Sequence, residues 1–136
     1  MPSIFTKIIE GDIPAYKLAE NDEYLAFFDI NPLKKGHALV VPKKEVDYIF
    51  DLDDETYSGL MTFSKKLSAA IEENVQCKRI ALVVLGLEVP HAHVHLIPMD
   101  KESDIRFSNP RVKMSENEFK ELAVKISKSF DKITGK

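Results

Sequence analysis

The stretch His91-Ala-His-Val-His-Leu-Ile-Pro98 decides how this chain folds, because imidazole and aliphatic side chains alternate along it. A β-strand sends successive side chains to opposite faces of its sheet, so the alternation predicts a strand over residues 91–99. The histidines would share one face, which we expect to be open and rich in titratable groups. The small and aliphatic residues between them would share the other face, beneath helices. The three histidines of this run are His91, His93 and His95.

Length and composition predict one globular domain over residues 1–136, since 44% of the residues are hydrophobic and 30% are charged. The net charge of −3 argues against nucleic acid as a partner, because nucleic-acid binders usually carry a basic field. Cys77 is the single cysteine, so no disulfide can form within the chain, and a reducing, cytoplasmic location is expected. No apolar run approaches the ~18 residues of a membrane span, and the first residues lack a secretory signal pattern, so no membrane partner is expected.

Hydrophobic periodicity predicts the order helix, three strands, helix, two strands, helix. Short links between neighbouring strands favour an antiparallel sheet, so we expect an α+β fold with five antiparallel strands, a long helix and helices near both ends. The strand over residues 78–85, which is nearly all apolar after Arg79, is expected at the centre of the sheet. The predicted core spans residues 3–99, with a helical tail over residues 115–131. The predicted strands cover residues 15–20, 24–29, 37–41, 78–85 and 91–99.

Three interpretations of the histidine run stand beside one another. Histidines can simply be packed residues with satisfied hydrogen bonds. They can bind a metal, because alternating histidines on a strand present nitrogen ligands to one ion, although no carboxylate or cysteine stands at an obvious ligand spacing. They can also serve phosphoryl chemistry, in which a neutral imidazole attacks phosphorus and a protonated neighbour assists the leaving group.

The phosphoryl interpretation is strengthened by a resemblance. The segments 36–42 and 91–98 resemble those of the histidine triad (HIT) family of nucleotide-binding proteins, whose motif is three histidines alternating with apolar residues. The opening segment 3–9, the segment 25–32 and the long helical segment 51–67 resemble the family too, so the likeness runs from Ser3 to about Met99.

The resemblance implies a nucleotide phosphoramidase or nucleotidyl hydrolase that works through a nucleotidyl-histidine intermediate. It assigns the nucleophile to His93 and the contact with the phosphate and leaving group to His95. It assigns the orientation of the nucleophile to His91 and the upstream His37. It implies neither a cofactor nor a catalytic metal. Thr6 and Ile9 stand where some members carry zinc-binding cysteines, so no zinc is expected there.

The resemblance also implies a binding site for a purine nucleotide or a nucleoside phosphoramidate. Asp29 would bind the ribose hydroxyls, although an aspartate before Asn31-Pro32 could instead cap a turn. Apolar side chains would enclose the base, although most of them could equally be plain core residues. Glu88 and Val89 fall in the segment that faces the phosphate. The apolar candidates are Phe5, Ile8, Phe27, Ile30 and Leu39.

The phosphate segment departs from the family pattern. Residues 84–90 form a short version of it, with Leu87 in place of a usual glutamine and Glu88 in place of a usual serine or threonine. A carboxylate 4 Å from a phosphate would repel it by about 4 kcal/mol at an effective dielectric constant of 20. Two alternatives therefore stay open: a nucleotide-binding module with little or no turnover, and a metal-dependent hydrolase whose ligands are the histidines.

The family is usually homodimeric, through its long helix and a neighbouring strand. A homodimer is therefore expected, with residues 53–74 and 77–85 in the interface. The resemblance further suggests that residues 107–111 reach the site of the partner protomer, with Arg106 or Arg111 as a phosphate contact.

Overall fold

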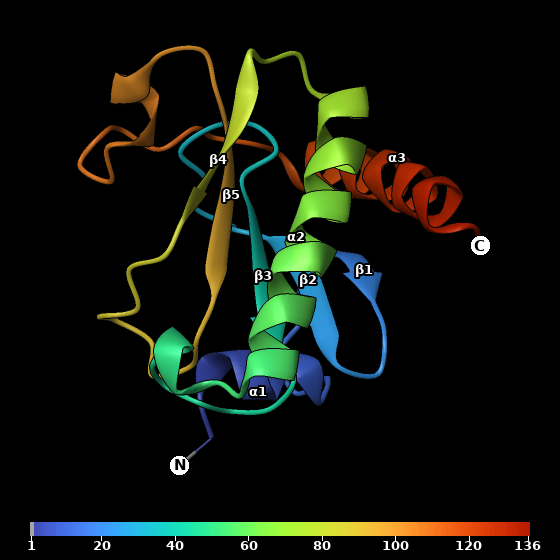
Figure 1. Ribbon diagram of the computed structural model, residues 1–136. Coiled ribbons are helices and arrows are strands. Elements are labelled where there is room, and N and C mark those ends of the chain that lie inside the picture. Colours follow the sequence, from blue (N-terminus) through green and yellow to red (C-terminus); the bar gives the residue numbers. More distant parts are fainter. Residues whose placement is uncertain (1) are drawn as a thin grey trace.

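The computed structural model describes residues 2–136 and contains a five-stranded sheet with helices on both of its faces (Figure 1). Within these residues, no helix is both long and apolar enough to cross a lipid bilayer. The helices are α1 (Ile4–Ile9), α2 (Asp54–Asn74) and α3 (Glu116–Thr134), with short 3-10 turns η1 (Ile49–Asp51) and η2 (Glu102–Ile105). The strands are β1 (Lys17–Glu20), β2 (Tyr24–Phe28), β3 (Ala38–Pro42), β4 (Arg79–Val83) and β5 (Val94–Met99).

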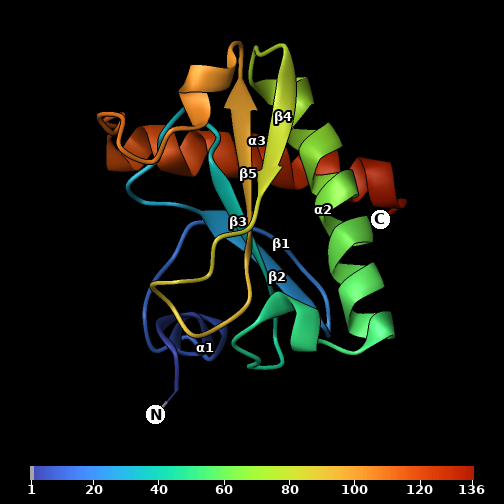
Figure 2. The ribbon, with the colours of Figure 1, turned by 60° about the vertical axis from the view of Figure 1, so that its left-hand side comes forward.

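The five strands are hydrogen-bonded in the order β1-β2-β3-β5-β4, and every neighbouring pair is antiparallel. This confirms the α+β class and the five-stranded antiparallel sheet. The position predicted for β4 was wrong, because β4 forms an edge of the sheet and β3 lies at its centre (Figure 2). Its apolar composition therefore needs an explanation other than burial on both sides by neighbouring strands.

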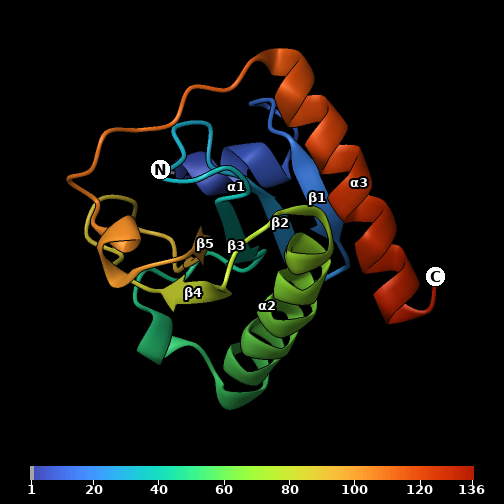
Figure 3. The ribbon, with the colours of Figure 1, turned by 90° about the horizontal axis from the view of Figure 1, so that it is seen from above.

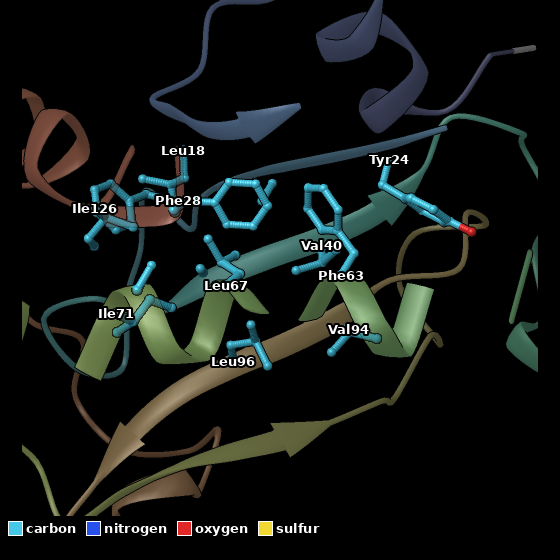
Figure 4. Packing of buried hydrophobic residues seen from close by; sticks show 14 of the residues in the cluster. Leu18, Tyr24, Phe28, Val40, Phe63, Leu67, Ile71, Val94, Leu96 and Ile126 are labelled. Carbon is cyan, nitrogen blue, oxygen red and sulfur yellow. The ribbon is translucent and has the colours of Figure 1, made fainter. Parts of the chain in front are cut away.

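One face of the sheet carries the main hydrophobic core, which α2 and α3 cover. Val40 of β3 and Val94 and Leu96 of β5 meet Leu67 and Ile71 of α2 in this core (Figure 4). Because all five side chains are buried, they supply much of the favourable burial that stabilises the fold.

The opposite face carries a smaller apolar cluster beneath α1, and Figure 3 shows α1 and α2 on opposite sides of the sheet. Leu39 pairs with His95 across β3 and β5, so both side chains belong to this face. The alternation read from the sequence is therefore confirmed where it separates Val94 and Leu96 from His95. The buried members of the smaller cluster are Phe5, Ile8, Leu25, Phe27, Leu39 and Val41.

The strand expected over residues 91–99 begins three residues later, at Val94. The Nε2 of His91 lies 2.8 Å from the backbone oxygen of Pro42, so the imidazole occupies an acceptor at the end of β3. The backbone N–H of Ala92 donates instead to Val46, outside the sheet. The histidine side chain thus ends the strand pairing, which shows why a periodicity argument places this boundary too early.

Local sequence signals fix the helix starts. Ser3, Asp53 and Ser115 are the N-caps of α1, α2 and α3, and each accepts a hydrogen bond from a backbone N–H in the first turn. Ser115 and Glu118 also form a reciprocal capping box.

Candidate active site

His93 offers an unprotonated ring nitrogen to the site. Its Nδ1 lies 2.8 Å from the backbone oxygen of His91, and a carbonyl oxygen can only accept, so Nδ1 carries the proton. In the neutral ring the Nε2 then holds a lone pair. Burial is the main cause that lowers the pKa of His93, so the ring is neutral near neutral pH. This nitrogen can attack an electrophile such as phosphorus.

His95 offers the opposite group, an N–H. The backbone N–H of Leu33 donates to Nδ1 of His37 over 3.0 Å, so the proton of neutral His37 sits on Nε2. That Nε2 donates to Nδ1 of His95 over 3.0 Å, which leaves the proton of neutral His95 on its Nε2. A chain of two hydrogen bonds that starts at a backbone amide therefore presents an N–H donor beside the lone pair of His93. The ring centroids of His93 and His95 are 5.1 Å apart.

His91 is buried, and both of its ring nitrogens have hydrogen-bond partners within the protein. Its Nε2–H donates to the Pro42 oxygen, and the Ser3 hydroxyl lies 2.8 Å from its Nδ1. The carboxylate of Glu45 accepts hydrogen bonds from the Ser3 backbone and from the Thr6 hydroxyl, at 2.7 and 2.6 Å. The first turn of α1 is therefore tied to the histidine run through His91.

The histidines are buried, so the expectation of an open imidazole face was wrong. His37 and His91 are fully buried, and His93 and His95 keep only 6% and 7% of their surface exposed. Two phenylalanines help to cover His93 and His95: the ring centre of Phe5 lies 4.9 Å from that of His93, and the ring centre of Phe107 lies 5.0 Å from that of His95.

Burial also sets the charge of these rings. Burial lowers the pKa of His37 to about 3 and that of His95 to about 4, with smaller contributions from neighbouring positive charge. Both rings are therefore neutral near neutral pH. The expected division into a neutral nucleophile and a protonated partner is replaced by two neutral rings in complementary tautomers.

Asp29 lies at the edge of the same group, with one carboxylate oxygen 3.7 Å from Nε2 of His37. Its other oxygen accepts the backbone N–H of Asn31 over 2.8 Å, so Asp29 also caps the turn, as its position before Asn31-Pro32 suggested. Burial raises the pKa of Asp29, while the Asn31 N–H and the positive charge of Arg111 oppose that rise. An ionised carboxylate here can accept hydrogen bonds from a vicinal diol.

Most of the apolar candidates lie together in the smaller cluster, beside the histidines. Phe5, Ile8, Phe27 and Leu39 are all buried there, and Val89 packs against them from the connector before the histidine run. The structure does not bring Ile30 into this group, since its side chain is 73% exposed. Glu88 is also exposed.

Asp29, His37 and His95 present ligand atoms within 4.8 Å of one another, which is close enough to hold a metal ion. The tautomers oppose that use. A histidine ligand needs a lone pair on the coordinating nitrogen, whereas the Leu33 N–H leaves the Nε2 of His37 protonated. The positive charge of Arg111 also acts on all three groups. This arrangement suits hydrogen bonding better than cation binding.

Several contacts of the site were not predicted from the sequence. Ser3 is recognisable as a helix cap, but its bond to His91 joins residues far apart in the chain, which no local pattern indicates. Residues 107–111 were expected to reach a partner protomer, yet Phe107 packs against His95 and His37 of its own chain. The Arg111 guanidinium lies 5.6 Å from the Phe107 ring centre.

Comparison with known proteins shows the family to which the chain belongs. A family model described as the HIT domain matches residues 10–102, which contain all four histidines and Asp29. The chain belongs to the HIT family. The parts of the site contributed by Ser3, Phe5, Phe107 and Arg111 lie outside the matched HIT domain.

Relatives and solved structures extend the likeness beyond the HIT domain. A Schizosaccharomyces pombe protein named adenosine 5′-monophosphoramidase is 39% identical over 129 residues, covering 93% of this chain and 97% of its own. An uncharacterised HIT-like protein of Borreliella burgdorferi is 35% identical over 132 residues, covering 91% and 95%. The crystal structure of a HIT-like protein from Bartonella henselae matches with a TM-score of 0.80 at 30% identity, covering 93% and 95%.

Proposed function

We propose that this chain, acting as one domain over residues 1–136, is a nucleotide phosphoramidase that cleaves a nucleoside monophosphate from an amine through a nucleotidyl-His93 intermediate. The observation that carries the proposal is the pair of complementary tautomers, a lone pair on His93 Nε2 beside an N–H on His95 Nε2. Membership of the HIT family and the S. pombe relative named adenosine 5′-monophosphoramidase support the same reaction class.

The reaction takes two steps. In the first, the Nε2 lone pair of His93 forms a bond to phosphorus, and the phosphorus–nitrogen bond breaks. Its electron pair leaves with the nitrogen, which takes a proton from water and departs as an amine. In the second, water attacks phosphorus, the bond to His93 breaks, its electron pair returns to Nε2, and a proton is released to solvent. The nucleoside monophosphate leaves, and the imidazole is regenerated.

His95 would act as a neutral hydrogen-bond donor in both steps. Its Nε2–H is fixed by His37 and Leu33, so it can stabilise negative charge on the phosphoryl oxygens and the leaving atom without being protonated. His91 and Ser3 would hold the backbone that orients His93.

The nucleoside would be held beside the histidines. Asp29 would accept hydrogen bonds from the ribose hydroxyls, and a purine would lie against the smaller apolar cluster and Val89. The exposed Ile30 side chain would close over the base, and Glu88 would face the solvent side of the phosphate segment. Binding energy from base and ribose would then position the phosphorus for attack.

A homodimer is part of the proposal. Among residues 2–136, the exposed large apolar side chains Leu82, Leu85 and Leu87 lie along and just after the edge strand β4, together with Tyr48 and Phe50. These side chains line a cavity of about 520 Å³ between η1, α2 and β4. An apolar edge strand is a liability in a monomer and a natural surface for a second copy. We place the protein in the cytoplasm, as the lone Cys77 suggests.

The experiment compares two leaving groups. His93→Ala should lower turnover of adenosine 5′-phosphoramidate at least about 1,000-fold, because losing the nucleophile removes the covalent route. Turnover of adenosine 5′-(p-nitrophenyl phosphate) by the same variant should fall by the same factor. His95→Ala should lose less on the p-nitrophenyl ester than on the phosphoramidate, because p-nitrophenolate needs less help to leave. Nucleotide binding by calorimetry checks that both variants remain folded.

The outcomes separate the alternatives. Unchanged turnover in His93→Ala would overturn the nucleophile. Nucleotide binding by the wild-type protein without turnover of either substrate would favour a binding module. Stoichiometric metal in the purified protein, with activity lost on chelation, would favour a metal-dependent hydrolase over the tautomer argument.

A further inference from the structure

Residues 106–112, here called the strap, lie between η2 and α3 in the chain. The strap touches the site through Phe107, whose ring lies 5.0 Å from that of His95 and 6.3 Å from that of His37. The matched HIT domain ends at residue 102, so these contacts lie outside the matched range. The Phe107 ring shields the His95 ring, which would donate to the substrate.

Arg111 joins the strap to the turn that carries Asp29. One terminal nitrogen of its guanidinium donates to the backbone oxygen of Asn31 over 2.9 Å, and the other donates to that of Phe107 over 3.2 Å. A planar, two-pronged donor can hold two carbonyls in a fixed relation, which a lysine ammonium does less well. The Val112 N–H adds a bond to the Pro32 oxygen over 2.8 Å.

We propose that Arg111 is a positioning residue: it locks the strap to the Asp29 turn, so that Phe107 holds the His95 imidazole toward the substrate while Asp29 stays directed at the ribose. The inference rests on the proposed phosphoramidase reaction and deepens it. In this proposal, the Arg111 guanidinium holds the ribose-binding Asp29 and the phosphate-binding His95 in fixed positions relative to each other.

Electrostatics gives the same residue a second effect. The positive charge of Arg111 lowers the pKa of Asp29 against the effect of burial, and it lowers the pKa values of His37 and His95 further. Two other titratable groups face Asp29 and His95 as well: His37, whose Nε2 lies 3.7 Å from the Asp29 carboxylate and 3.0 Å from Nδ1 of His95, and His93. Arg111 thus favours an ionised Asp29 and neutral imidazoles, the states that ribose binding and the tautomer chain require. Without it, the pKa values of Asp29 and His95 should both rise.

The test uses the full chain and four variants. Arg111→Met removes both the charge and the donors, Arg111→Lys keeps the charge alone, and Phe107→Ala removes the aromatic contact. Lys113→Met is the matched control, because it removes a positive charge from an exposed neighbour of Arg111. Turnover of adenosine 5′-phosphoramidate is measured across pH, and the pKa values of Asp29 and His95 are followed by carbon and nitrogen NMR.

Arg111→Met and Phe107→Ala should each lower kcat/KM about 100-fold, the scale of a misplaced catalytic group, while Lys113→Met should match the wild type. The acidic limb of the pH profile should move to higher pH in Arg111→Met and stay in place in Arg111→Lys. Arg111→Lys should still lose turnover, because one ammonium cannot hold both carbonyls.

Two results would overturn the inference. One is an Arg111→Met protein with a lower melting temperature but unchanged kcat/KM and unchanged His95 ring signals, which would make the residue merely structural. The other is an equal loss of kcat/KM in Lys113→Met, which would mean that only the net charge of the protein matters. If the wild-type protein fails to cleave the substrate, the proposed function fails, yet the NMR shifts of Asp29 and His95 still decide whether Arg111 controls them.

Discussion

At the scale of residues, the chemistry of the site depends on which ring nitrogen of each histidine carries a proton. The carbonyl of His91 fixes His93, and the amide of Leu33 fixes His37 and, through it, His95. Both partners are backbone groups, so substituting the side chains of His91 or Leu33 would not remove them. Their presence explains how two identical side chains, two positions apart, can offer opposite hydrogen-bonding groups.

The buried neutral histidines predict that stability falls in mild acid. An unfolded histidine titrates near 6.5, whereas His37 and His95 titrate at about 3 and about 4 in the folded chain. Their contribution to the free energy of unfolding is complete above pH 6.5. It is lost as the pH falls from 6.5 to about 3 for His37 and about 4 for His95, because in this range the unfolded chain binds protons that the folded chain does not bind. Each histidine should cost about 1.4 kcal/mol per pH unit in this window. Urea unfolding at several pH values measures the slope.

His37→Gln supplies the comparison for this measurement. It removes one titrating ring, so unfolding free energy should fall less steeply with decreasing pH than in the wild type. The raised pKa of Asp29 works in the opposite direction and offsets part of the slope. Equal slopes in the two proteins would mean that His37 is protonated in the folded state.

At the scale of elements, α1 is short but controls the histidine run. Its N-cap Ser3 bonds to His91, and its Phe5 covers His93. A helix of six residues has little stability of its own, so α1 depends on these tertiary contacts and on Glu45. The sequence predicts the helix, but it does not indicate what the hydroxyl of its N-cap binds.

Ser3→Ala should therefore cost more than an ordinary cap. Losing the cap costs about 1 kcal/mol. Losing the 2.8 Å partner of the buried His91 Nδ1 costs about 1 kcal/mol more, because the Thr6 hydroxyl lies farther away, at 3.4 Å. Asp53→Ala removes the cap of α2 and no histidine contact, so it gives the baseline. Chemical denaturation measures both, and Ser3→Thr should restore the wild-type value. Equal losses in Ser3→Ala and Asp53→Ala would show that the bond to His91 adds nothing.

At the scale of the whole molecule, the edge position of β4 calls for another explanation of its apolar sequence. Its apolar residues favoured a central strand, which is the usual place for such a run. Within one chain the strand has β5 on one side only, and Leu82 remains 48% exposed. In the homodimer that we propose, a second copy would cover this edge, and the composition of β4 would then fit its surroundings.

Leu82→Glu tests that assembly. A carboxylate placed in the interface would lose its water without gaining a partner, so the dissociation constant should rise at least about 100-fold. Val124→Glu is the matched control, because Val124 is similarly exposed, at 52%, on α3 and away from β4. Analytical ultracentrifugation should find dimers of the control and monomers of Leu82→Glu. A dimeric Leu82→Glu protein would place the interface elsewhere.

Local patterns in the sequence determined the α+β class and the element order, because alternation and helical periodicity act between residues close in the chain. The roles of the four histidines and Asp29 followed from the resemblance to the HIT family. Only the tertiary structure decided the strand order, the burial of the imidazoles, their tautomers and the place of the strap. These depend on bonds such as His37 to His95 and Arg111 to Asn31, which join residues 58 and 80 positions apart. Such pairs leave no periodic trace in the sequence, since packing alone brings them together.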